Sequence, residues 1–144
     1  MAITSAICNS FKQEILEAEH NFATSGGNTF NLALYDSDAT LNKSTTAYTT
    51  SEELATTGGY TAKGNALTSV TPVLDSDTAV CDFSNSSWTS ASFTANGCLI
   101  FNDSASGDPS VCAIAFGGDK TVTSGTFTIE FPAAAASTAI IAIA

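Results

Sequence analysis

Residues Trp88–Asn102, which read WTSASFTANGCLIFN, decide the fold of this chain. In the first half of the stretch Ala91, Phe93 and Ala95 fall on alternate positions, and the four residues after Asn96-Gly97 are apolar on both faces. Alternation of this kind, with aromatic residues, predicts a β-strand. The Asn96-Gly97 step is compatible with a tight hairpin turn or with a bulge in one long bent strand. We expect this stretch at the centre of an antiparallel sheet.

Shorter strands are predicted on both sides of this stretch, with turns rich in Gly, Ser and Asp between them. They span residues 29–35, 47–50, 65–74, 78–83, 111–116, 121–123, 126–131 and 138–143, with a hairpin loop at 75–77 and a turn at 117–119. Short strands at regular spacing with Gly-rich turns indicate a mainly β protein. The fold expected is an antiparallel β-sandwich of about eight strands.

Residues 4–20 are the one segment with a helical pattern. Starting one residue before this segment, apolar residues recur at every fourth position: Ile3, Ile7, Phe11 and Ile15. This period places them on one face of an amphipathic helix, for which Thr4 is the expected N-cap. We therefore divide the chain into an N-terminal helix, residues 1–22, and a β-sandwich domain, residues 23–144. The apolar stripe either covers a face of its own β domain or docks onto another subunit, so these four residues are the candidate partner interface.

The composition excludes several classes of partner. Only 12 % of the 144 residues are charged, about half of the usual share of roughly 25 %. The chain has four lysines, no arginine and fourteen acids, and its net charge is −10. Because the lysines are scattered, no basic patch is present to bind nucleic acid. No run of about 18 apolar residues and no signal peptide is recognisable, so we expect no membrane span and synthesis in a cytoplasm.

No cofactor or metal is expected. The four cysteines, Cys8, Cys81, Cys98 and Cys112, lack the C-x-x-C spacing of zinc sites. We expect reduced thiols, with a Cys98–Cys112 bridge between neighbouring strands as the alternative. Residues 36–38, Asp-Ser-Asp, begin like a calcium loop, but the Gly and the terminal Glu of that motif are missing, so these aspartates are interpreted as turn residues.

No catalytic site is predicted. The only histidine, His20, follows the helix and is interpreted as a capping or surface residue. Asp82 lies within a predicted strand on the side opposite to its apolar neighbours, where solvent exposure is expected. Trp88 and Tyr60 are residues that could stack on a sugar, but a single Trp in a small β domain is usually a core residue. We therefore expect a protein that is not an enzyme.

The whole chain resembles a family of small virion proteins of tailed bacteriophages, common among phages of aquatic bacteria. The segments that carry the resemblance are MAITSAICNSFKQEIL (1–16), NTFNLALYDSDATL (28–41), GYTAKGN (59–65), WTSASFTANGCLIFN (88–102), FGGDKTVTSGTFTIEFP (116–132) and IIAIA (140–144). These motifs are structural and contain no catalytic signature. The chain departs from the expected pattern at residues 51–57, SEELATT.

The resemblance implies a structural protein of the virion, assembled in the host cytoplasm. Within that class we expect a capsid decoration or cement protein, a homotrimer whose partner is the major capsid protein. A decoration protein adds contacts that form only on the mature shell and thereby stabilises it. The alternatives are a tail or baseplate component, or a host-binding fibre component with a sugar site.

Overall fold

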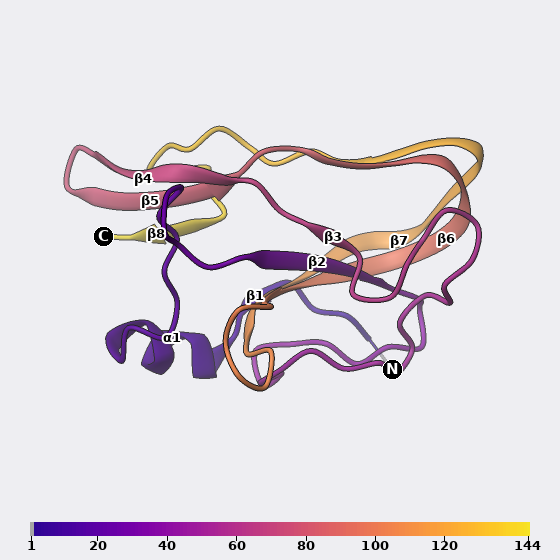
Figure 1. Cartoon of the computed structure of the whole chain (residues 1–144), viewed down its shortest axis with the longest axis horizontal. Coiled ribbons are helices and arrows are strands. Elements are labelled where there is room, and N and C mark those ends of the chain that lie inside the picture. The colour runs from indigo at the N-terminus through magenta and orange to yellow at the C-terminus, as the bar shows by residue number, and fades with distance from the viewer. Residues whose placement is uncertain (1) are drawn as a thin grey trace.

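The computed structural model describes residues 2–144 and is mainly β, with two antiparallel sheets and one short helix (Figure 1). The five-stranded sheet has the order β1 (Ala6–Ile7), β7 (Ser110–Ile129), β6 (Ser86–Asn102), β2 (Phe30–Tyr35) and β3 (Asn65–Ala66). The three-stranded sheet has the order β4 (Ser69–Asp75), β5 (Thr78–Phe83) and β8 (Ile141–Ile143). Helix α1 spans Asn9–Leu16. The predicted fold class is confirmed.

Strands β6 and β7 form one long antiparallel ribbon that builds most of the molecule. Figure 1 shows this ribbon turning back at one end, so that its two halves lie in two layers. Asn96-Gly97 is not a hairpin turn, because β6 continues through it with a shift of register between Ala95 and Gly97. A Cβ at Gly97 would lie 2.6 Å from the carbonyl oxygen of Ile114. Glycine therefore permits the close approach of β7 at the bend.

The turn predicted at residues 117–119 is wrong. Strand β7 continues from Ser110 to Ile129 and absorbs the predicted strands 111–116, 121–123 and 126–131 into one. Gly117 and Gly118 have φ values of 76° and 138°, which glycine adopts without steric cost. The glycines thus bend a continuous strand, since the facing strand β6 continues to supply partners from Ala95 to Gly97.

The core has two parts, and β2 lies between them. Phe30, Leu32 and Leu34 face the larger cluster, which lies between the layers and includes Trp88, while Ala33 and Tyr35 belong to a second cluster on the other face. All six residues of β2 are buried. The sequence pattern predicted one inward face; the second face is covered by residues 2–5 and by the loop after β2, through side chains such as Ile3 and Leu41.

The N-terminal helix is shorter than predicted. It begins after Cys8 instead of Thr4 and comprises only eight residues. The preceding residues Ala6 and Ile7 pair with Ala113 and Cys112 of β7, and the N–H of Thr4 donates to the carbonyl oxygen of Leu41. Backbone groups engaged in these bonds are not free for helix formation. Residues 1–22 therefore contribute a strand to the large sheet as well as a helix.

The remaining elements follow the prediction in part. Strand β5 matches residues 78–83, and the loop at residues 75–77 closes the predicted β4–β5 hairpin. The predicted strand 65–74 is divided into β3 and β4, and β8 covers only the end of the predicted strand 138–143. Residues 47–50 form no strand; their one ladder contact is a bridge between Ala47 and Pro109.

Candidate functional site

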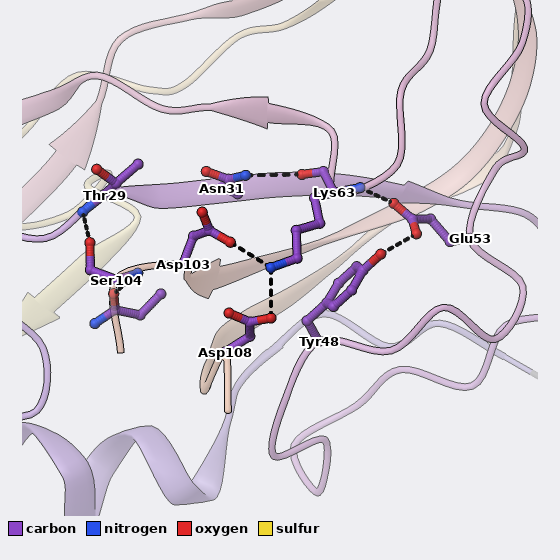
Figure 2. A network of polar contacts seen from close by, with 9 residues as sticks. Thr29, Asn31, Tyr48, Glu53, Lys63, Asp103, Ser104 and Asp108 are labelled. Carbon is purple, nitrogen blue, oxygen red and sulfur yellow. Dashed lines mark hydrogen bonds and ion pairs between the residues drawn. The ribbon is translucent and has the colours of Figure 1, made fainter. Parts of the chain in front are cut away.

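An extended polar network lies around Lys63 (Figure 2). Its Nζ donates to Asp103 Oδ1 at 2.7 Å and to Asp108 Oδ2 at 2.8 Å. The same ammonium lies 5.5 Å from the centre of the Tyr48 ring, a cation–π distance. The two carboxylates raise the pKa of Lys63, so this side chain stays charged. Lys63 therefore links its own turn to the loop of residues 103–108.

A single carboxylate, that of Glu53, holds the other side of this network. Its Oε1 accepts from the backbone N–H of Lys63 at 2.6 Å and from the Tyr60 hydroxyl at 2.7 Å, while its Oε2 accepts from the Tyr48 hydroxyl. Burial and the bond to Glu53 raise the pKa of Tyr48 to about 12. The Tyr60 hydroxyl in turn accepts from the N–H of Leu34 in β2. Each of these groups is used to fix a loop against the sheet.

His20 is buried, with 6 % of its surface exposed, so the prediction of a capping or surface histidine is wrong. The amide nitrogen of Asn102 lies 3.2 Å from Nδ1, and the amide oxygen of Asn102 accepts from the N–H of Ser104. On the other side of the ring, Nε2 lies 2.7 Å from Glu14 Oε2, so both ring nitrogens have a polar partner. The Phe11 ring packs against the imidazole at a centroid distance of 4.9 Å.

Asp82 is also buried, with 1 % exposed, which corrects the expectation of an exposed side chain. One carboxylate oxygen accepts from the N–H of Phe83 at 2.9 Å, and the other has no hydrogen-bond partner in residues 2–144. Burial raises the pKa of this carboxyl above its ordinary value. Asp82 lies in β5, the middle strand of the three-stranded sheet, and the last four residues of this strand are all buried.

Three acidic side chains from two surface loops lie close together. Carboxylate oxygens of Asp36, Asp38 and Glu52 lie within 4.8 Å of one another. Asp36 accepts from the backbone N–H of Asp38 at 2.9 Å, which is the turn that the sequence predicted. Glu52 joins them from a different loop, so no linear motif could have shown it. With one oxygen from each carboxylate, the cluster offers three of the six to eight oxygen ligands that calcium takes.

All four cysteines are free and buried. Cys98 pairs with Ile114 across the ladder, whereas Cys112 pairs with Ile100, so the two cysteines are not opposite each other and form no bridge. Burial raises the pKa of each thiol, to about 12 for Cys81. A protonated, buried thiol is a poor nucleophile and a poor metal ligand.

The four residues of the predicted interface do not share one helix face. Ile3 precedes β1, Ile7 lies in β1, and only Phe11 and Ile15 belong to α1. Ile3 and Phe11 are buried in the chain's own core, with 9 % and 3 % exposed. Ile7 and Ile15 are half-buried and pack against the larger core cluster. Ile7 and Ile15 each line a depression that is open to solvent.

Apolar depressions mark the surface at several places. One, of about 520 Å³, opens beside β7, and its lining includes Ile114 and Phe116 from one half of the ribbon and Phe127 and Ile129 from the other. Beyond Ala115, the outer edge of β7 pairs with no strand in the described part of the chain. An unpaired edge beside an apolar groove is a surface onto which another protein segment can add. A smaller depression, of about 120 Å³, lies between α1 and the three-stranded sheet.

No family model, curated protein or solved structure matches the chain. Within residues 2–144, no helix is long and apolar enough to cross a membrane.

Proposed function

We propose that the chain is a non-enzymatic structural protein of a tailed-bacteriophage virion, and specifically a decoration protein that binds across subunits of the capsid. The sequence resemblance described above supports the class of protein. The surface supports the role, because few charged residues and many small polar ones suit a protein that packs into an assembly. The major capsid protein is the proposed partner.

The observation that carries the proposal is the free edge of β7 beside its apolar groove. A decoration protein must present contact surface that is already formed, because ordering a flexible segment on binding reduces the affinity. Here the edge belongs to a twenty-residue strand whose other side is held by β6 along much of its length. The loops at the far side of the sheet are fixed by Lys63 and Glu53. The surface is thus presented on a rigid body.

Each copy that binds through such a surface adds a stabilising contact to the capsid shell. Each square ångström of apolar area removed from water contributes about 25 cal/mol before the costs of association are subtracted. A contact that forms only on the mature shell favours that state over the disassembled one. Because the contact is repeated over the whole particle, a small footprint for each copy has a large summed effect.

Removal and restoration of the chain test this role. Particles produced without the chain should assemble but release their DNA at a lower temperature than complete particles, as followed with a DNA-binding dye. Adding the purified chain back should restore the release temperature. Unchanged heat resistance without the chain would contradict a decoration role. Light scattering on the purified chain, which we propose is a trimer, gives the oligomeric state in the same preparation.

A further inference from the structure

The exposed apolar side chains are concentrated at one end of the molecule. Among residues 2–144 the large apolar residues classed as exposed are Leu16, Val73, Leu74 and Ile143. Leu16 lies in the last turn of α1, and the other three lie in the three-stranded sheet. Figure 1 shows α1 and this sheet at the same end of the molecule. Clustered exposed apolar side chains mark an interaction surface, whereas single ones need no explanation. Val73 alternates with Leu74 along β4 and therefore lies on the other face of the sheet.

Strand register places part of this set in a row. Leu74 of β4 is opposite Ala79 of β5, and Ala79 is opposite Ile143 of β8. Residues opposite each other across a ladder point to the same face of the sheet. The row is therefore a continuous apolar strip over three strands, and its outer members, Leu74 and Ile143, are 74 % and 53 % exposed.

The strip continues inward into a depression. A space of about 120 Å³ is lined by Ala79, Cys81, Ile141 and Ile143 on the sheet side and by Ile15 and Phe22 on the side of α1. Cys81 and Ile141, the next row of the ladder, are buried. The depression thus has a closed inner end and an exposed apolar entrance. We name the row and the depression together the α1–β8 cleft.

The surroundings of the cleft are acidic. Glu17 and Glu19 follow Ile15 at the end of α1, and Asp77 lies at the tip of the β4–β5 hairpin, whereas the Asp75 carboxylate accepts from the backbone N–H of Ala136. Lys12 is the only lysine of α1, and its Nζ contacts Asn9 Oδ1 in the first turn, away from the end of the helix that lines the cleft. A second copy of this chain, with a net charge of −10, would bring like charges together at this rim.

We propose that the α1–β8 cleft binds a segment of a different, basic protein, in which an apolar side chain is flanked by Lys or Arg. The apolar side chain would enter the depression between Ile15 and Ile143, and the cations would face the acids of the rim. Complementary charge selects this partner over a second copy and speeds its encounter. The inference does not depend on the assignment to a virion.

The probe is the blocked pentapeptide Lys-Leu-Lys-Leu-Lys, titrated into the isotope-labelled full chain and followed by the NMR shifts of backbone amides. Shifts should saturate at the amides of Leu74, Ala79 and Ile143. The peptides Lys-Ser-Lys-Ser-Lys and Glu-Leu-Glu-Leu-Glu should bind at least about tenfold more weakly, since each lacks one of the two required features. Equal binding of either control peptide, or no saturable shifts at these amides, would overturn the proposal.

Variants of the chain locate the site. Ile143→Ser should weaken binding by about tenfold, and Asp77→Asn by several-fold with a smaller dependence on salt. The control, Asp38→Asn, removes an equivalent exposed charge from the loop after β2 and should leave the affinity unchanged. Equal loss in Asp77→Asn and Asp38→Asn would indicate non-specific attraction and contradict the proposal. So would shifts of the cleft amides that depend on protein concentration without peptide, because they would indicate a second copy in the cleft.

Discussion

Glu53 accepts a hydrogen bond of 2.6 Å from the backbone N–H of Lys63, at a residue whose φ is 70°. A non-glycine residue adopts this left-handed conformation at a cost, so the surrounding bonds must hold it there. The bond to Glu53 is one of them, and the two ion pairs of the Lys63 ammonium and the bond from Asn31 Nδ2 to the Lys63 carbonyl oxygen are further ones. The Glu53 carboxylate thus stabilises the turn that places the Lys63 side chain between Asp103 and Asp108.

Glu53→Gln should lower the free energy of unfolding by about 2 to 3 kcal/mol. The neutral amide of Gln accepts fewer and weaker hydrogen bonds than the Glu53 carboxylate. Its own N–H groups would face the hydrogen-bond donors to which the carboxylate is now bonded. Urea denaturation followed by tryptophan fluorescence measures the change. Glu52→Gln is the matched control, because Glu52 is exposed and adjacent in sequence, and it should change the free energy by less than about 0.5 kcal/mol. Equal effects of the two variants would contradict the role given to Glu53.

Phe11→Ala should destabilise the chain by about 3 to 5 kcal/mol, because it leaves a cavity among Phe22, His20 and their neighbours. Leu16→Ala, in the same helix, should cost less than about 0.5 kcal/mol since Leu16 is 87 % exposed. Thermal unfolding of both variants distinguishes a core residue from an interface residue. A stable Phe11→Ala variant that fails to bind its partner would restore Phe11 as an interface residue.

Asp82 should make stability depend on pH in an unusual direction for an acid. Burial raises the pKa of the folded state, so the charged form carries a penalty above the folded pKa. The penalty shrinks as the pH falls through the folded pKa and is absent below the unfolded value. Relative to Asp82→Asn, the native chain should therefore gain stability between pH 7 and about pH 3.5. Unfolding free energies of both proteins across this range provide the check, and a relative loss on acidification would contradict it.

The four thiols should be unreactive in the folded chain. Burial both excludes the reagent and raises the thiol pKa values, so little thiolate is present at neutral pH. A colorimetric thiol reagent should give almost no rapid reaction under native conditions and four equivalents in guanidinium chloride. Fewer equivalents in denaturant without reductant would reveal a disulfide, and rapid native reaction would show that a thiol is exposed.

The strands with a clear local hydrophobic pattern were predicted correctly from the sequence. The alternation in residues 78–83 and 29–35 located β5 and β2, and the apolar stretch from Trp88 located β6. The continuous course of β7 through Gly117 and Gly118 was not predictable, because the pairing with β6 outweighs the turn preference of glycine. The helix of residues 4–20 was overestimated for the same reason: the pairing of Ala6 and Ile7 with β7 is a long-range contact.

The candidate sites depend even more on contacts between distant residues. His20 and Asn102 are 82 positions apart, and Lys63 and Asp108 are 45 apart. No spacing rule connects such pairs. The α1–β8 cleft requires both the register of three strands and the true end of α1, which the sequence pattern extended too far.

The most direct test of the central claim is the number of copies of this chain in a purified particle. Quantitative mass spectrometry gives the ratio of the chain to the major capsid protein. A decoration protein should show a ratio near one or a simple fraction of it such as about a third, as symmetric binding on a shell requires. A ratio of a few per cent, on the order expected for a tail component, or absence from the particle would contradict the account.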